Sequence, residues 1–191
     1  MVSVARFVGC CQLCGHEQKL PGDVLAAHGY TVRWGFFSGT CMGSGHLPFE
    51  LSKDLIENAI AGALLQAEGL EKEAADLQKP ATDPKATCRV HRTQQQSKHG
   101  EKPGYAWIKG QIESRPPRHG MQYVVIDDNG QEFYVHKGDY TATTALDAAT
   151  YNNGLYSHSL MIRATQLREY AAWQSERVKN WMPQPLRPIK K

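Results

Sequence analysis

The sequence predicts an α+β fold with a Cys- and His-rich N-terminal module, a long amphipathic helix, a small antiparallel β-sheet and a C-terminal helix. Three observations lead to this prediction. Cysteines, histidines and glycines are concentrated in residues 1–49, apolar residues recur with a helical period over 50–79, and the period changes to two after residue 104. The chain has 191 residues, of which 41% are hydrophobic. That is enough for a packed core, and it excludes a globally disordered chain.

The N-terminal module contains the motif Cys11-Gln-Leu-Cys14-Gly15. Two cysteines separated by two residues can direct both thiolates to one tetrahedral ion, and the following glycine relieves crowding where the backbone turns. Cys41 is the third candidate ligand, because it lies in a second glycine-flanked segment, Gly39-Thr-Cys41-Met-Gly43. This pattern is typical of zinc ribbons, so we expect a zinc-ribbon-like module over 1–49.

The fourth ligand is either His28 or His46, and we favour His28. Residues 29–40 can run out and back as a β-hairpin, which would bring His28 and Cys41 to its two ends. Three thiolates and one imidazole are a recognised composition for a structural zinc site. Cys10 is one position out of register and is expected to be a bystander or an occasional substitute ligand. The expected ligands of a structural Zn²⁺ ion are Cys11, Cys14, His28 and Cys41.

A bound zinc ion would also account for the stability of this module. Residues 1–49 hold few large aliphatic side chains, and so small a segment rarely folds on its own core. A structural zinc site contributes about 10–16 kcal/mol near neutral pH. The alternatives are buried thiols or a redox-active Cys-x-x-Cys motif. The redox motif requires a surrounding βαβ pattern, which the sequence does not show.

Residues 50–79 are expected to form one long helix. Ser52 is a suitable N-cap, and Asp54 in the first turn complements the helix dipole. Pro80 ends the helix. The apolar stripe at 3.6-residue spacing consists of Ile56, Ile60, Ala63, Ala67, Leu70, Ala74 and Leu77.

Residues 80–104 are expected to be a polar connector that leads into the sheet. The strands are expected over 105–112, 121–126 and 132–136, and Pro116-Pro117 is expected to separate the first two. The tripeptide Asp128-Asn129-Gly130 lies between the last two. It predicts a hairpin with a type I′ turn, because Asn and Gly tolerate a positive φ.

A second amphipathic helix is expected over 159–181, within a C-terminal part at 105–191. The two helices would form an antiparallel pair that covers the sheet. Prolines after residue 181 are expected to end this helix and to leave a short basic tail. The apolar stripe, which Gln174 interrupts, consists of Leu160, Ala164, Leu167, Ala171, Val178 and Trp181.

The N-terminal module resembles a stretch of small uncharacterised phage and prophage proteins. Those proteins similarly combine a Cys-x-x-Cys knuckle with a His-Gly-Tyr segment and a Gly-x-Cys-x-Gly segment. Here these segments are His28-Gly-Tyr30 and Gly39-Thr-Cys41-Met-Gly43. The resemblance covers residues 1–55 and implies a zinc site and a phage genomic setting. It implies no activity.

Basic residues are concentrated in two blocks. Residues 80–118 contain eight basic and three acidic groups, and residues 157–191 contain seven and two. Such blocks either contact a polyanion or balance acidic segments of the same fold. Trp and Arg are also enriched at binding hot spots. The candidate contact residues are Arg89, Arg92, Lys98, Lys102, Trp173 and Arg177.

We expect a non-enzymatic, cytoplasmic accessory protein of phage type that binds a host protein or nucleic acid, as regulators and anti-defence inhibitors do. The alternatives are a zinc-dependent enzyme acting on nucleic acid or nucleotide, and a sequence-nonspecific nucleic-acid-binding protein. An enzyme would need a general base, and no Asp or Glu lies at a diagnostic spacing from the ligands. Cys88 and His91 are expected to be incidental. The apolar runs are too short for a membrane span, so no membrane partner is expected.

Overall fold

The computed structural model describes residues 5–31, 37–93, 104–118, 121–135 and 144–189. The predicted α+β class is confirmed, because two helices accompany antiparallel sheets. The chain divides into two compact units, and each helix contributes residues to both of them. Unit 1 consists of Met1–Gln66 and Gln166–Lys191, and unit 2 consists of Ala67–Thr165.

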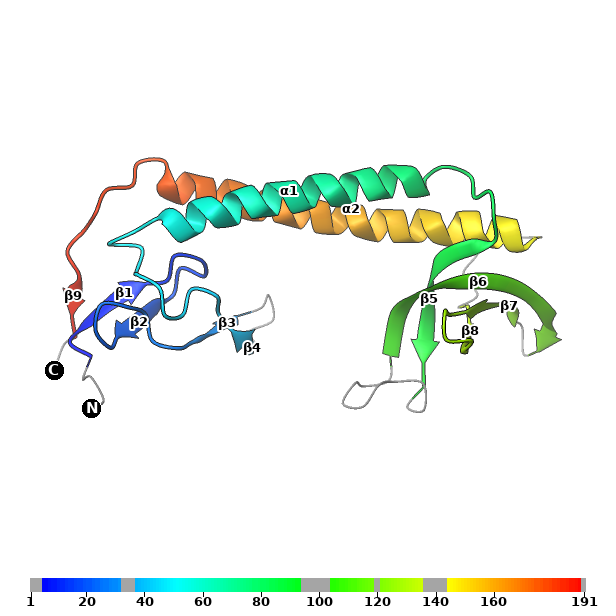
Figure 1. Cartoon of the computed structure of the whole chain (residues 1–191), viewed down its shortest axis with the longest axis horizontal. Coiled ribbons are helices and arrows are strands. Elements are labelled where there is room, and N and C mark those ends of the chain that lie inside the picture. Colours follow the sequence, from blue (N-terminus) through cyan, green and yellow to red (C-terminus); the bar gives the residue numbers. More distant parts are fainter. Residues whose placement is uncertain (1–4, 32–36, 94–103, 119–120, 136–143, 190–191) are drawn as a thin grey trace. The chain divides into compact units, whose positions relative to one another are not determined.

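The elements can be followed in chain order in Figure 1. Strands β1–β4 and β9 belong to unit 1, and β5–β8 belong to unit 2. The elements are β1 (Phe7–Cys10), β2 (Glu17–Leu20), β3 (Gly29–Thr31), β4 (Phe37–Thr40), α1 (Asp54–Leu77), β5 (Lys85–Arg92), β6 (Gly104–Arg118), β7 (Met121–Ile126), β8 (Glu132–Tyr134), α2 (Ala145–Val178) and β9 (Arg187–Pro188).

Unit 1 contains a three-stranded antiparallel sheet in the order β2-β1-β9. β1 and β2 form a hairpin, and the Cys11–Cys14 knuckle lies between them. The sequence predicted only a basic tail after residue 181, and the structure corrects this, because β9 pairs with β1. Leu186 next to β9 packs against the small core that holds Leu20 and Leu25. Burial of the Leu186 side chain in this contact stabilises the return of the tail to the sheet.

The second hairpin of unit 1 was predicted, and the structure confirms it. β3 pairs with β4 antiparallel, with Gly29 opposite Thr40. One residue beyond this pair, the N–H of Cys41 donates a hydrogen bond of 2.8 Å to the carbonyl of His28. The hairpin therefore carries His28 and Cys41 at its two ends.

Helix α1 confirms the predicted first helix, although it begins at Asp54. The N–H of Asp54 donates to Oγ of Ser52 at 3.2 Å, so Ser52 satisfies a backbone donor at the start of the helix. The predicted stripe faces inward, with four of its members buried and the others half-buried. The buried members are Ile56, Ala63, Ala67 and Ala74.

Helix α2 begins fourteen residues before the predicted start at residue 159, which corrects that boundary. Its start is a capping box: the N–H of Asp147 donates to Oγ1 of Thr144, and the N–H of Thr144 donates to the Asp147 carboxylate, both at 3.0 Å. The first turns then bury Ala148 together with Asn152, whose Nδ2 donates to the carbonyl of Ala148 at 2.8 Å. Because Asn152 is polar although buried, a search for apolar residues at helical spacing does not find this part of the helix.

Strand β5 lies inside the predicted polar connector, so the prediction of a connector over 80–104 is also corrected. Residues of β5 alternate between buried and exposed side chains, and its buried members include Cys88 and Val90. Strand β6 is also longer than predicted and continues through Pro116-Pro117. The pairing of β6 with β7 shifts register between Ser114 and Arg118, and prolines are tolerated at such irregularities because they have no N–H to contribute.

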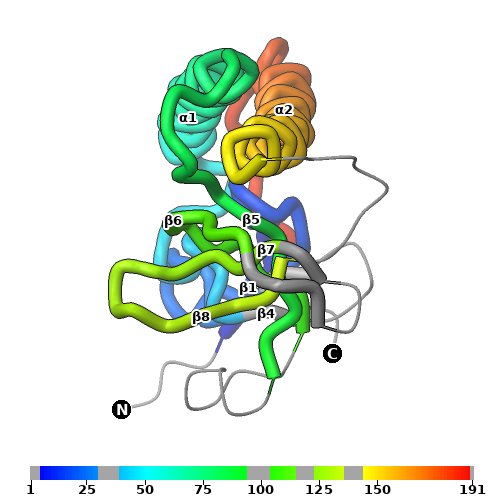
Figure 2. The backbone as a smooth tube through the Cα atoms, turned by 90° about the vertical axis from the view of Figure 1, so that its right-hand side faces the viewer, coloured from blue at the N-terminus to red at the C-terminus, as the bar shows by residue number. Residues whose placement is uncertain are grey.

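Unit 2 contains a four-stranded antiparallel sheet in the order β5-β6-β7-β8, whose strands are labelled in Figure 2. The predicted β7–β8 hairpin is confirmed, but its loop spans 127–131, because Ile126 pairs with Glu132. The N–H of Gly130 donates to the carbonyl of Asp127 at 3.0 Å, and Gly130 has a φ of 77°. The expected two-residue type I′ turn is therefore replaced by a longer loop.

The edges of this sheet meet, because Val90 of β5 forms an antiparallel bridge with Val135 just after β8. The enclosed core belongs to unit 2 alone. Its buried members are Ala86, Cys88, Val90, Ile112, Tyr123, Val125, Phe133, Val135, Ala148 and Ala149. The first turns of α2 therefore close one part of this core. The sequence predicted that a pair of helices covers the sheet, whereas the helical members of this core, Ala148 and Ala149, both belong to α2.

Candidate metal centre

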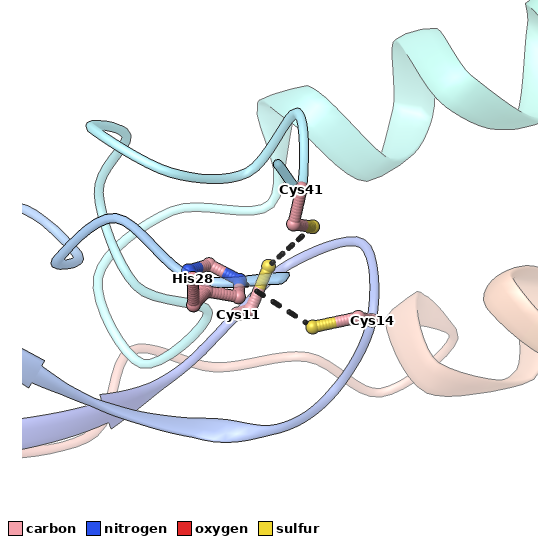
Figure 3. Close-up of side chains that lie close together, drawn as sticks. All are labelled: Cys11, Cys14, His28 and Cys41. Atoms are coloured by element: carbon pink, nitrogen blue, oxygen red, sulfur yellow. Dashed lines mark hydrogen bonds between the residues drawn. The ribbon is translucent and has the colours of Figure 1, made fainter. Parts of the chain in front are cut away.

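Three cysteines and one histidine of unit 1 converge at a single point. Cys11 and Cys14 come from the knuckle after β1, His28 precedes β3, and Cys41 follows β4. Their ligand atoms all lie within 4.8 Å of one another, and Figure 3 shows the four side chains together. This is the quartet that the sequence predicted.

The separations of the ligand atoms fit a tetrahedral zinc ion. With a Zn–S bond of about 2.3 Å and a Zn–N bond of about 2.0–2.1 Å, tetrahedral angles place two sulfurs about 3.8 Å apart and a sulfur and a nitrogen about 3.5 Å apart. The Sγ atoms of Cys11 and Cys41 are 3.8 Å apart. Sγ of Cys14 lies 3.5 Å from Nε2 of His28. The side chains are thus arranged for a shared ion.

Backbone geometry at the knuckle explains how two thiols of one short segment reach the same point. The N–H of Cys11 donates to the carbonyl of His16 at 2.9 Å, and the N–H of Gly15 donates to the carbonyl of Cys11 at 3.0 Å. Gly15 has a φ of 75°, a conformation that glycine adopts without strain. The glycine of the motif therefore has the conformational role that the sequence suggested.

Gly43 allows a close approach of the backbone to the sulfurs. A Cβ atom at this position would lie 2.3 Å from Sγ of Cys11 and 3.7 Å from Sγ of Cys41. Because the first distance is far below a van der Waals contact, only glycine leaves room for the thiol there.

His28 is held by hydrogen bonds that orient its ring. Nδ1 donates to the carbonyl of Ala26 at 2.9 Å, and Oγ of Ser44 lies 3.2 Å from the same nitrogen. The backbone N–H of His28 also donates to Oγ of Ser44 at 3.1 Å. With its proton on Nδ1, the ring presents the lone pair of Nε2 to the thiols, as a metal ligand requires.

The thiols differ in acidity. Burial raises the pKa of Cys14 to about 12 and raises the pKa of Cys41. For Cys11, burial acts in the same direction, but hydrogen bonds from the N–H groups of Cys14 and Leu13 stabilise the thiolate more strongly. The net effect is a lowered pKa of Cys11. The charge of the Cys11 thiolate also opposes ionisation of Cys14 and Cys41 and so raises the pKa of both. A divalent cation removes this conflict, because its charge stabilises all three thiolates at once.

Two residues that the sequence left open lie outside the quartet. His46 is exposed, and the cluster of ligand atoms includes His28 instead. Cys10 is half-buried at the end of β1, where its N–H donates to the carboxylate of Glu50 at 2.9 Å, and burial raises the pKa of its thiol. Neither residue belongs to the group that the described residues offer to a metal.

The end of α2 supports the knuckle from outside. Nη1 of Arg177 donates to the carbonyl of Gln12 at 2.7 Å, and Nη2 donates to the carbonyl of Cys11 at 3.3 Å. The guanidinium also lies over the rings of Phe49 and Trp173. The sequence predicted Arg177 as a partner contact, whereas its donors bind the knuckle of its own chain. The signal in the sequence was Gln174, because a polar residue that interrupts the apolar stripe indicates that this face of the helix meets polar groups.

An apolar groove with a volume of about 590 Å³ borders the cluster. Met42 and Trp173 are its most exposed large apolar side chains, at 80% and 48%. Trp173, one of the predicted contact residues, therefore lies half-exposed beside the cluster. The groove is lined by Leu13, Cys14, His16, Thr40, Cys41, Met42, Tyr170 and Trp173.

Two of the other predicted contact residues, Arg89 and Arg92, belong to β5 in unit 2. Arg89 is exposed, and Arg92 is half-buried at the end of the strand. Lys98 and Lys102 lie outside the described residues. Cys88 is fully buried in the core, and burial raises the pKa of its thiol to about 12.

The fold and the cluster together describe an α+β chain with a candidate Cys3His metal centre. No family model, curated protein or solved structure matches the chain. In the described part of the chain, neither helix combines the length and apolarity needed to cross a membrane.

Proposed function

We propose that the chain is a zinc-stabilised binding protein and that its metal centre is structural. The observation that carries this proposal is the convergence of four ligand atoms within 4.8 Å. Three thiolates and one imidazole fill all four positions of a tetrahedral zinc ion and leave none for a water molecule. A closed site of this kind stabilises a fold, and the small core of unit 1 depends on such a contribution.

The alternative of a zinc enzyme is less well supported. A catalytic zinc has three protein ligands and an open position, with an acid or base nearby. Among the described residues, the group of possible ligands contains Cys11, Cys14, His28 and Cys41 and no carboxylate. The donor set thus favours a structural role.

The groove beside the metal centre supports a role in binding another protein. Met42 and Trp173 expose large apolar surfaces there, and Met and Trp are enriched at protein interfaces. We propose that an apolar side chain of a partner protein enters this groove. The metal would shape the binding surface directly, because its ligands Cys14 and Cys41 line the same groove. The more specific role, as a phage regulator or anti-defence inhibitor of a host protein, rests on analogy with the phage genomic setting that the resemblance implies.

The metal assignment is tested by the composition of the purified protein. Protein prepared without chelator is expected to contain one zinc ion per chain by elemental analysis. His28→Ala should lose the metal, whereas His46→Ala, the matched histidine variant, should retain it. Substitution by Co²⁺ should give the visible absorption of a tetrahedral thiolate site. Absence of stoichiometric metal in the wild-type protein would refute the proposal.

The binding role is tested by comparing two exposed methionines of unit 1. Met42→Ala should weaken capture of a partner protein from nuclease-treated bacterial lysate, and Trp173→Ala should weaken it further. Met182→Ala is the matched control, since Met182 is 73% exposed and does not line the groove. Equal capture by Met42→Ala and Met182→Ala would exclude the groove as the contact. Capture that depends on nucleic acid would instead make the lysate partner a nucleic acid.

A further inference from the structure

The outer face of the β5–β6 hairpin in unit 2 differs chemically from its inner face. The inner face carries Ala86, Cys88 and Val90, which are buried in the core. The residues between them point outward and are paired across the two strands. These outward pairs are Lys85 with Gln111, Thr87 with Lys109, Arg89 with Trp107, and His91 with Tyr105. The outer face therefore combines basic side chains with two neighbouring aromatic ones; we call it the β5–β6 face.

The aromatic rings of this face are accessible. Tyr105 is 55% exposed, and Trp107 is 36% exposed. They lie two residues apart on one strand, which separates them by about 6.7 Å along the sheet. The Arg89 guanidinium carbon lies 4.7 Å from the centre of the Tyr105 ring, and the His91 ring packs edge-on against the same ring at 5.2 Å. These contacts hold the Tyr105 ring in place while leaving much of its surface open.

A hollow with a volume of about 440 Å³ adjoins the Trp107 end of the β5–β6 face. The rings of Trp107 and Tyr156 form part of its wall and lie 5.1 Å apart. Lys85 and Lys109 line it as well, together with the carboxylates of Glu73 and Asp83. The hollow thus offers aromatic surface, positive charge and hydrogen-bond acceptors to one planar polar group.

We propose that the β5–β6 face binds single-stranded nucleic acid, with bases stacked on Tyr105 and Trp107. Stacking on aromatic side chains beside basic groups is the common means by which proteins bind single strands without sequence preference. The phosphates would contact Arg89, Lys85 and Lys109. This inference concerns unit 2 and does not depend on the proposed metal centre or its groove.

The geometry favours a single strand over a duplex. The bases of a duplex are stacked on one another, so their faces are unavailable to Tyr105 and Trp107. An acidic peptide would use the three basic groups but would gain little from two open rings. The carboxylates of Glu73 and Asp83 repel phosphates from the inner part of the hollow. They are suited instead to accept hydrogen bonds from the amino group of a base.

The test is fluorescence anisotropy with the full-length, metal-loaded protein. The probes are a labelled oligodeoxycytidylate and a labelled oligocytidylate of about 16 nucleotides, within the site size of single-strand binding domains, and their bases carry the amino group that Glu73 and Asp83 would accept. Both single strands should bind more tightly than a duplex of the same length, and the tighter of the two identifies DNA or RNA as the ligand. For three phosphate contacts, the logarithm of the binding constant should fall against the logarithm of salt with a slope of about −2.

Two tyrosines provide a matched pair of variants. Tyr105→Ala should weaken binding by about 5- to 150-fold, which is the effect of losing one stacked base. Tyr105→Phe should restore it, because the ring is retained. Tyr134→Ala should bind like the wild-type protein, since Tyr134 is also 55% exposed but lies on β8. Arg89→Gln should reduce the magnitude of the salt slope by the amount that corresponds to about one phosphate contact. Lys79→Gln should leave the slope unchanged.

Several outcomes would overturn the proposal. One is a dissociation constant for both single strands weaker than about 10⁻⁴ M at low salt, the weak end of non-specific binding. Others are equal affinity for duplex and single strand, or equal weakening by Tyr105→Ala and Tyr134→Ala. Circular dichroism of each variant shows whether the fold is retained. Loss of metal binding by His28→Ala would bear only on the metal centre.

Discussion

Gln174 of α2 donates a hydrogen bond from Nε2 to the carbonyl of Leu13, 2.8 Å away, in the middle of the Cys11–Cys14 knuckle. Gln174 is fully buried, and its Oε1 accepts a hydrogen bond of 2.6 Å from Arg177. The N–H groups of Leu13 and Cys14 point to the sulfur of Cys11. The carbonyls of Cys11, Gln12 and Leu13 also need hydrogen-bond partners. The last turns of α2 provide them.

Gln174→Ala is therefore expected to destabilise unit 1. The substitution leaves the Leu13 carbonyl without this donor and removes an acceptor of Arg177, so the free energy of unfolding should fall by about 1–3 kcal/mol. Denaturant unfolding measures this change. Gln166→Ala is the control, because Gln166 is exposed on the same helix and should change stability little. An equal loss in both variants would mean that the hydrogen bond to the knuckle contributes nothing specific.

Gly43→Ala is expected to abolish metal binding. The new methyl group would lie 2.3 Å from Sγ of Cys11, so the thiol must leave its position. Elemental analysis should find little metal in this variant. Gly62→Ala provides the opposite control, since a Cβ at Gly62 in α1 meets nothing within 4 Å. It should retain the metal and raise stability by about 0.5–1 kcal/mol. Full metal content in Gly43→Ala would contradict the packing described here.

Ser44→Ala tests the groups that orient His28. Oγ of Ser44 lies 3.2 Å from Nδ1 of His28 and also accepts the His28 N–H. Its removal should lower metal affinity by about tenfold, at the weak end of the effects seen for outer-shell partners. Competition with a chromophoric chelator measures the affinity. Ser175→Ala is the control, because its hydroxyl donates to Ala171 within α2. No difference between the variants would show that Ala26 alone orients the ring.

The ligand quartet was predictable because each part of it is local in sequence. Cys11 and Cys14 share one turn, and Cys41 has flanking glycines. His28 followed from hairpin geometry, since a segment that returns on itself brings its ends together. The support from Gln174 and Arg177 was not predictable, because it links residues more than 160 positions apart. Nothing in the local sequence of α2 specifies which carbonyls it meets.

Two of the corrected elements, β5 and the start of α2, share a physical cause. Strand β5 has a polar outer face, so its composition resembles a connector although Cys88 and Val90 alternate with Arg89 and His91. The start of α2 buries Asn152, which an apolar-periodicity search counts as solvent-exposed. In both cases the composition of the segment suggests a position at the surface, but tertiary contacts bury part of it.

Asp127 in the β7–β8 loop is expected to be more acidic than an ordinary aspartate. Hydrogen bonds from the N–H groups of Gln131 and Asn129 to the side chain lower the pKa of Asp127. Because the folded-state pKa is depressed, these bonds stabilise the loop above the unfolded pKa, and the stabilisation is lost as pH falls through the folded pKa. A carboxyl-carbon NMR titration should therefore show Asp127 ionising below the usual value of 3.8. A midpoint at or above that value would contradict these hydrogen bonds.

Removal of the metal should affect the two units differently. The core of unit 1 includes the ligands Cys11 and Cys41 themselves, whereas the core of unit 2 contains no member of the quartet. Treatment with a strong chelator should therefore collapse the amide NMR dispersion of β1–β4, while signals of β5–β8 persist. Readdition of Zn²⁺ should restore the first set. Loss of both sets together would show that unit 2 depends on unit 1 for its fold, and survival of both would show that the metal is not structural.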